Sequence, residues 1–189
     1  ESVKGEIEFD HVSFAYPEAG ENVLTDISFK AKKGQTIAVI GSTGSGKSTL
    51  INLIPRYYDV TKGSVKVDGV DVRDMTQKEL RDKLGYVPQK GVLFSGTIDS
   101  NIRYGKPEIT DAQVKEAAEV AQATEFIDTK PEKYESPVSQ GGTNVSGGQK
   151  QRLSIARAIA KDPEIFIFDD SFSALDFKTD SQLRKALKE

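Results

Sequence analysis

Residues 41–48 carry the pattern that decides the fold: Gly41-Ser42-Thr43-Gly44-Ser45-Gly46-Lys47-Ser48. They match the phosphate-loop pattern G-x-x-x-x-G-K-[ST], in which glycines let backbone N–H groups approach phosphate oxygens at the start of a helix. The continuously apolar Ile37–Ile40 predicts a central strand over residues 35–40, covered on both faces. The alternative is a glycine-rich turn beside a chance lysine, and the strand–loop–helix context favours the phosphate loop.

Two carboxylates extend this pattern further along the chain. The apolar run Ile165–Phe168 predicts another buried strand, and Asp169 and Asp170 follow directly. Lys47 is expected to reach the β- and γ-phosphates, while the Ser48 hydroxyl and Asp169 are expected to hold Mg²⁺. Asp170 is a candidate general base for the attacking water. Taken alone, Asp169 also fits a turn or helix cap.

The composition excludes several other classes of function. Of the 189 residues, 37% are apolar and 29% charged, and the net charge of -3 gives a nucleic-acid partner no electrostatic support. With no cysteine and one histidine, only oxygen ligands remain for a metal. No apolar run approaches the roughly 20 residues that span a bilayer. The start lacks a signal-peptide core and residues 181–189 read as an uncapped helix, so we expect an intracellular domain or an excised, truncated piece.

The remaining pattern indicates an α/β fold with the site at the carboxyl ends of its core strands. Alternation over residues 5–14 predicts a half-exposed antiparallel strand, and a second is expected over residues 24–31. Asp68-Gly69 between apolar alternations predicts a hairpin with a two-residue turn. Thr110 and Gln113 fit a capping box, which opens a helical middle third.

A second helix N-terminus is predicted at residues 146–149. Ser146-Gly147-Gly148-Gln149 precedes residues 150–160, a strong helix former with one apolar face. A serine cap leaves backbone N–H groups exposed there. In isolation this pattern would favour a plain helix cap.

Together these segments resemble the ATP-binding-cassette (ABC) ATPases. Asn144-Val145-Ser146-Gly147-Gly148-Gln149 is similar to the family's LSGGQ signature, with Val145 in place of leucine. It lies after a phosphate loop and before a strand with carboxylates, the order found in that family. Residues 93–98 and 101–105 further resemble the exporter branch. Three other segments are similar to the A-loop, Q-loop and D-loop, in this order: Phe14-Ala15-Tyr16, Val87-Pro88-Gln89 and Ser173-Ala174-Leu175-Asp176.

The resemblance implies a fold and its subdomains. The fold class is α/β, a P-loop NTPase core with a mostly parallel sheet, an N-terminal antiparallel β subdomain and a helical signature subdomain. One domain over residues 1–189 is expected. Residues 1–35 and 60–75 would form the β subdomain, residues 36–59, 76–89 and 155–189 the core, and residues 90–154 the helical part.

It also implies ligands and partners. ATP and Mg²⁺ are the expected cofactors, with Tyr16 stacking on the base, although Tyr16 also fits a plain core residue and stacking does not exclude GTP. Gln89 would sense Mg²⁺ or water and connect to the membrane domain. The expected catalytic residues are Asp170, Gln89 and Lys47. The nucleotide contacts would come from Tyr16, Gly41, Ser42, Thr43, Gly44, Ser45, Gly46, Lys47, Ser48 and Thr49.

The partners implied are a second ABC nucleotide-binding domain and a transmembrane domain, at the cytoplasmic side of a membrane. The two nucleotide-binding domains would form a head-to-tail dimer, with Ser146, Gly147, Gly148 and Gln149 at the partner's ATP. No nucleic-acid partner is expected.

The sequence departs from the family at its catalytic position. The usual glutamate after the strand aspartate is Asp170, and losing one methylene withdraws the carboxylate by about 1 Å, so hydrolysis should be slow. The H-loop histidine is expected beyond Glu189, and His11 fits a solvated or structural role. An aspartate at the catalytic position beside an intact Ser146-Gly147-Gly148-Gln149 resembles the degenerate half of a heterodimeric exporter. A non-hydrolysing dimerisation module and a soluble ABC ATPase are the alternatives.

Overall fold

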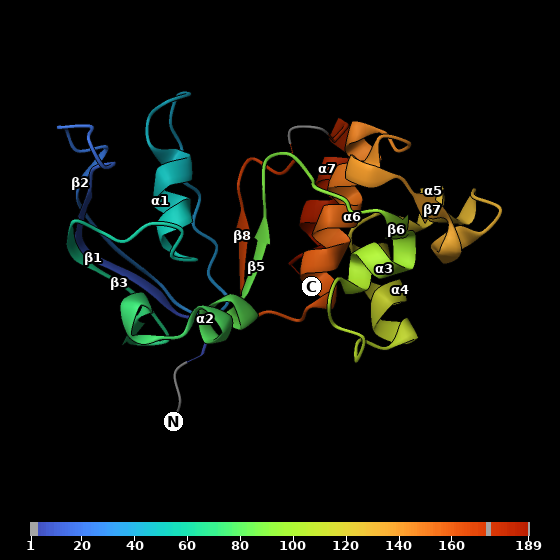
Figure 1. Cartoon of the computed structure of the whole chain (residues 1–189), viewed down its shortest axis with the longest axis horizontal. Helices are drawn as coiled ribbons and strands as arrows, with labels where there is room; N and C mark the ends of the chain where they lie inside the picture. Colours follow the sequence, from blue (N-terminus) through green and yellow to red (C-terminus); the bar gives the residue numbers. More distant parts are fainter. Residues whose placement is uncertain (1–3, 173–174, 189) are drawn as a thin grey trace. The chain divides into compact units, whose positions relative to one another are not determined.

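The computed structural model describes residues 4–172 and 175–188. The chain divides into two compact units, Glu1–Leu84 and Gly85–Glu189, and each is treated by itself. Figure 1 labels their helices and strands along the colour-coded chain.

Unit 1 is built on an antiparallel sheet with strand order β2-β1-β3-β4. Its helical segments include the helix that follows the predicted phosphate loop, labelled α1 in Figure 1. The strands are β1 (Ile7–Phe14), β2 (Leu24–Ala31), β3 (Lys62–Val67) and β4 (Val70–Asp71), and the helices are α1 (Lys47–Leu53), the 3-10 turn η1 (Val72–Asp74) and α2 (Gln77–Lys83).

A bulge in β1 explains why its buried residues do not simply alternate. Phe9 pairs with Phe29 and Val12 pairs with Ile27, so three residues of β1 are matched by two of β2. At this step His11 has a φ of 48°, in the left-handed region. The shift turns Val12 inward after Phe9, and both side chains are almost completely buried.

The hairpin predicted at Asp68-Gly69 is confirmed. Val67 pairs with Val70 across a two-residue turn, and Asp68 and Gly69 have φ values of 53° and 79°. Two consecutive positive φ angles define a type I′ turn, whose twist matches that of the flanking strands. Asp68 also accepts a hydrogen bond from Lys83 Nζ at 2.9 Å, which anchors the turn to the end of α2.

The central strand predicted over residues 35–40 is wrong for this structure. These residues have no regular secondary structure, and the side chain of Ile40 is 93% exposed. An apolar strand is stable only when neighbouring strands satisfy its backbone N–H and C=O groups. The sheet of unit 1 is completed by β1–β4 and gives this segment no ladder partner.

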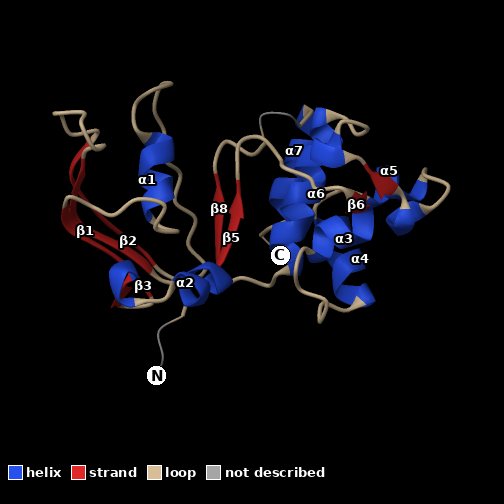
Figure 2. Cartoon of the chain, in the orientation of Figure 1, coloured by secondary structure: helices blue, strands red, loops and turns tan. Residues whose placement is uncertain are grey.

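Unit 2 is mostly helical, as Figure 2 shows by colour, and this confirms the helical middle third expected from the sequence. β5 (Leu84–Val87) pairs with β8 (Ile165–Phe168), and their arrows point the same way in Figure 1. The mixed α/β class with an N-terminal antiparallel sheet is therefore confirmed. The other elements are β6 (Gly96–Thr97), β7 (Pro137–Val138), α3 (Ile98–Arg103), α4 (Asp111–Val120), α5 (Thr124–Asp128), η2 (Lys133–Glu135), η3 (Gln140–Gly142), α6 (Gly147–Ala160) and α7 (Phe177–Ala186).

Helix α6 is the centre of the core of unit 2. It packs against α3 and α4, and its Leu153 and Ile155 are fully buried. The capping box expected at Thr110 and the serine cap expected at Ser146 are both present, so α4 and α6 begin where the sequence predicts. Because α6 is held along its length, its N-terminal turn has a fixed direction within the unit.

Candidate functional site

The predicted phosphate loop is a tight turn whose backbone strongly favours glycine at two places. Gly44 and Gly46 have φ values of 81° and 96°, and Gly46 is the N-cap of α1. Gly41 is constrained by space, because a Cβ there would lie 2.4 Å from Ser45 Oγ. Ser45 N donates to Ser42 O at 3.1 Å and closes the turn. The loop residues 41–45 are exposed, so their backbone is accessible to a ligand.

The side chains of Lys47 and Thr49, both in the first turn of α1, have different partners. Lys47 Nζ donates to the carbonyl oxygen of Gly41, so the ammonium group lies over the loop. Thr49 is buried, and its hydroxyl shares a 2.7 Å hydrogen bond with the hydroxyl of Tyr16. Helix α1 is therefore joined directly to Tyr16, the aromatic residue expected to stack on the nucleotide base.

The ring of Tyr16 lies in an aromatic cluster. It meets Phe14 and Tyr58 edge-to-face, at centroid separations of 4.9 and 5.2 Å. Sequence reasoning missed Tyr58, which is 41% exposed. No periodic or motif signal distinguishes this tyrosine from neighbouring surface residues.

The carboxylates lie where β5 and β8 end. Asp169 N donates to Val87 O at 3.0 Å, which continues the pairing of the two strands by one residue. Asp169 is half-buried and Asp170 is exposed. Gln89 Nε2 donates to Asp170 Oδ2 across 3.4 Å, a long hydrogen bond. The structure thus brings Gln89 to Asp170, the residue that follows Asp169 at the end of β8.

Asp170 has a left-handed backbone, with a φ of 47°. Aspartate tolerates this conformation better than most residues, because its short polar side chain bonds locally.

Two polar residues that sequence reasoning missed hold the segment before Gln89. Gln151 on α6 is 1% exposed, and its Nε2 donates to Pro88 O at 3.1 Å. Ser171 is fully buried and its hydroxyl donates to Val87 O at 2.6 Å. A glutamine within a helix gives no sequence signal that distinguishes a buried contact from a solvated one.

The N-terminal turn of α6 is accessible. Ser146 Oγ accepts a hydrogen bond from Gln149 N at 3.1 Å, and Gln149 Oε1 accepts one from Ser146 N at 3.2 Å. Ser146 and Gly147 are exposed, and a Cβ on Gly147 would meet nothing within 4 Å. Gly148 is half-buried.

The D-loop motif lies partly outside the described residues, which omit Ser173 and Ala174. Its last residue, Asp176, caps α7 by accepting a hydrogen bond from Thr179 N at 2.8 Å. This hydrogen bond from the backbone lowers the pKa of the Asp176 carboxyl group, because it stabilises the charged form.

The donor set expected for a metal is Ser48, Gln89 and Asp169. Hydroxyl, amide and carboxylate oxygens suit Mg²⁺, which binds through few protein groups together with substrate phosphates. Among residues 4–172 and 175–188 no cluster of three His, Cys, Asp or Glu side chains could hold a metal by itself. By the chemistry of their oxygen atoms, these three donors would suit a magnesium ion that a bound nucleotide also holds.

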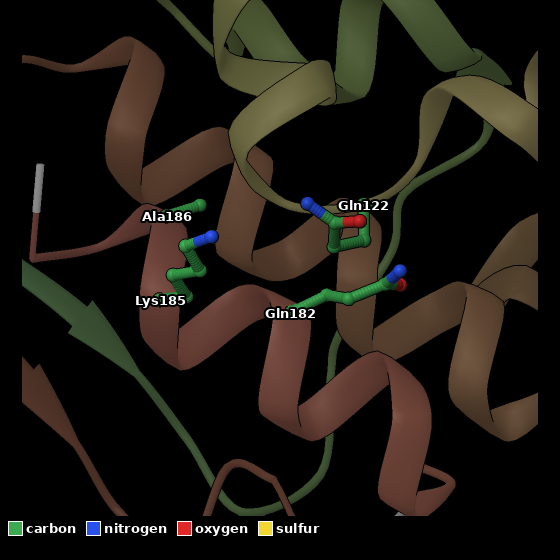
Figure 3. A pocket seen from close by; sticks show the side chains of 4 residues that line it. All are labelled: Gln122, Gln182, Lys185 and Ala186. Atoms are coloured by element: carbon green, nitrogen blue, oxygen red, sulfur yellow. The ribbon is translucent and has the colours of Figure 1, made fainter.

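Figure 3 shows an open pocket in unit 2. Gln122, which follows α4, lines it together with three residues of α7, namely Gln182, Lys185 and Ala186. None of the predicted site residues contributes to it.

Comparison with known proteins decides the family. The profile described as ABC transporter matches residues 24–173, which is most of the chain. This chain belongs to the ABC transporter family. The expectation of an ABC ATP-binding domain, drawn from the motif order, is confirmed.

Similar ABC proteins are longer than this chain. The Bacillus subtilis protein YgaD, named as a putative multidrug export ATP-binding/permease protein, is 46% identical over 99% of the chain and 32% of its own length. A Staphylococcus aureus protein with the same descriptive name is 47% identical over 97% of the chain and 32% of its own length. The structure of a bacterial Atm1-family ABC exporter with ATP bound matches with a TM-score of 0.92 at 38% identity, covering 98% of this chain and 32% of the other. The chain thus spans about a third of these relatives.

No helix among the described residues of this ABC domain is both long and apolar enough to cross a membrane.

Proposed function

We propose that this ABC domain binds ATP with Mg²⁺ and works within a transporter, where binding and hydrolysis of ATP drive export. The observation that carries the proposal is the glycine-dependent turn at residues 41–46, whose exposed backbone leads directly into α1. Such a turn directs N–H groups at an anion, and the family match makes a nucleotide the anion to expect. Its relatives' names combine an ATP-binding and a permease part, which supports a transmembrane domain as partner.

In this proposal each residue of the loop has a defined task. The backbone of residues 41–46 cradles the phosphates, and Lys47 exchanges its hydrogen bond to Gly41 O for the β- and γ-phosphate oxygens. Tyr16 stacks on the base, and its hydrogen bond to Thr49 keeps it in register with α1. Thr49, itself buried, acts through this bond and through the start of the helix.

Hydrolysis requires the residues at the ends of β5 and β8. Bound Mg²⁺ neutralises charge that develops on the phosphates, and Ser48, Asp169 and Gln89 are the residues that would hold it. Asp170 accepts the proton of a water molecule whose oxygen forms the new bond to the γ-phosphorus, while the bond to the ADP oxygen breaks. The products are ADP and inorganic phosphate. Gln89, already bonded to Asp170, orients that water.

The partner domain completes the chemistry in this account. Ser146, Gly147, Gly148 and Gln149 at the exposed start of α6 contact ATP held by a second ABC domain in a head-to-tail dimer. The transmembrane domain places both at the cytoplasmic face of a membrane. No nucleic-acid partner is proposed, since the net charge of -3 gives such a partner no overall electrostatic attraction.

A degenerate-site half of a heterodimer is the second candidate function. The short side chain of Asp170 favours it, because an aspartate carboxylate reaches less far from the backbone than that of glutamate. A base that is displaced by about 1 Å costs on the order of a hundredfold in rate. Such a half would bind ATP and lend its signature to the partner's site.

Lys47→Ala tests the proposed function by titration calorimetry with ATP and Mg²⁺. We expect affinity to fall at least about tenfold, because charge-assisted hydrogen bonds to phosphate are the strong contacts of such sites. Lys115→Ala, an exposed lysine of α4, is the matched control and should bind as the parent does. Unchanged affinity in Lys47→Ala would overturn the phosphate-loop assignment.

A further inference from the structure

An aromatic pair on the surface of unit 2 is held in an unusually defined arrangement. Phe94 and Tyr104 stack with centroids 4.6 Å apart and an interplanar angle of 10°. They are 43% and 53% exposed. Exposed aromatic side chains usually keep rotamer freedom, so a parallel stack at the surface needs a cause beneath it.

Arg157, in the last turn of α6, lies against both rings. Its guanidinium carbon is 5.3 Å from the Phe94 centroid and 5.1 Å from that of Tyr104, within cation–π range of each. Burial lowers the pKa of Arg157, because the charged form loses water. The two ring faces and a set of carbonyl oxygens compensate for this loss.

Each nitrogen of the guanidinium group has an acceptor. Nε donates to Asn101 O at 2.8 Å, Nη1 to Val92 O at 2.8 Å and Nη2 to Asn101 Oδ1 at 3.0 Å. A planar fork reaches three such acceptors at once, whereas the single nitrogen of lysine does not. Arg157 therefore joins α6 to the chain before and after the aromatic residue Phe94.

Asn101 on α3 connects Arg157 to the backbone of Phe94. It is 2% exposed, its Oδ1 accepts a hydrogen bond from Phe94 N at 2.8 Å, and its Nδ2 donates to Phe94 O at 2.8 Å. Both backbone groups of Phe94 are thus bonded to one side chain, and Arg157 bonds to that side chain in turn. Figure 1 shows α3, which carries Asn101, beside α6, which carries Arg157.

We propose that Arg157 is a positioning residue that fixes the Phe94–Tyr104 pair to α6. The pair then moves as one body with α6, the helix whose N-terminus carries Ser146 and the signature. The functional importance of this coupling rests on the proposed function. Arg152 of the same helix offers a contrast. It stacks on Phe126 and bonds to Gln122 O, so it serves another part of the unit.

The chain contains no tryptophan, so Tyr104→Trp supplies a single fluorescent reporter within the pair. In this background we compare Arg157→Lys with Arg157 intact, using acrylamide quenching and steady-state anisotropy of the introduced indole. Tyr104 is 53% exposed, so complete release of the ring raises its accessibility, and with it the quenching constant, by up to about twofold. We expect Arg157→Lys to approach that limit and to lower the anisotropy.

Two controls separate positioning from general loss of structure. Arg152→Lys changes the same residue type on the same helix and should leave quenching of the reporter unchanged. Phe94→Ala removes the stacked ring and should raise quenching even with Arg157 present, which shows that the reporter senses the pair. If Arg157→Lys unfolds by circular dichroism, Arg157→Met, of similar length and without charge, takes its place.

Parent-like quenching and anisotropy in a folded Arg157 variant would overturn the proposal. Quenching that rises equally in Arg152→Lys would also overturn it, because the effect would then belong to α6 as a whole. ATP affinity measured on the same variants keeps the proposed function separate. The ATP affinity of the Arg157 variants should match that of the parent. A loss of ATP affinity in Lys47→Ala bears only on the nucleotide site and does not test the role of Arg157.

Discussion

Gly91→Ala tests how closely the segment after Gln89 approaches α6. A Cβ on Gly91 would lie 2.7 Å from Ser154 Oγ and 2.9 Å from the Lys150 carbonyl oxygen, and the second of these is backbone that cannot rotate away. We expect the segment to be pushed off the helix, at a cost of about 2 kcal/mol for overpacking. For a chain of this length that corresponds to a fall in Tm of about 4–8 °C.

The local effect is measured at the neighbouring Lys90, which is exposed. Trypsin cleaves at lysine faster when the backbone around it opens, so limited proteolysis after Lys90 should accelerate in Gly91→Ala. Gly147→Ala is the matched control, because its Cβ would meet nothing within 4 Å and alanine favours the helix. If Gly91→Ala keeps both the parent Tm and the parent cleavage rate, the close approach is not a constraint and the reasoning fails.

The remaining predictions concern the nucleotide. Tyr16→Ala should weaken ATP binding by about 1–3 kcal/mol through lost stacking, and calorimetry in which inorganic triphosphate binds the parent as well as ATP does would contradict this role. Ser146→Arg should leave ATP binding by this chain unchanged yet abolish ATP-dependent association in sedimentation experiments; an equal loss of intrinsic binding would speak against a site in the partner. Asp170→Glu, in a full-length complex with a suitable partner whose phosphate-loop lysine is removed, should raise turnover at this site, because it restores about 1 Å of reach. Turnover no faster than the parent's would refute the account of a degenerate half.

Local signals in the sequence predicted the features that depend on local chemistry. The Asp68-Gly69 turn, which the structure confirms, was predictable because few residue pairs adopt two consecutive positive φ angles. The caps at Thr110 and Ser146 are confirmed because a side-chain oxygen and the residue three positions on satisfy backbone groups within one turn.

Features that depend on distant partners were not predicted. Residues 35–40 have the composition of a buried strand, but a strand exists only where neighbours supply its hydrogen bonds, and composition does not specify neighbours. Gln151 and Ser171 are further examples, since each bonds to a carbonyl oxygen more than 60 residues away in the sequence. The bulge at His11 was likewise invisible, because its cause is the register of β1 against β2.

The capping box at the start of α6 fixes the polarity of one hydroxyl group. Ser146 Oγ uses a lone pair to accept a hydrogen bond from Gln149 N, so its hydroxyl hydrogen can still be donated to a group outside the helix. An exposed serine held in this way presents a donor and prefers an acceptor such as an anionic oxygen. Aspartate caps a helix equally well, but its carboxylate has no hydrogen to donate and would repel an anion. Helix stability alone would therefore allow aspartate at position 146, whereas contact with an anion favours serine.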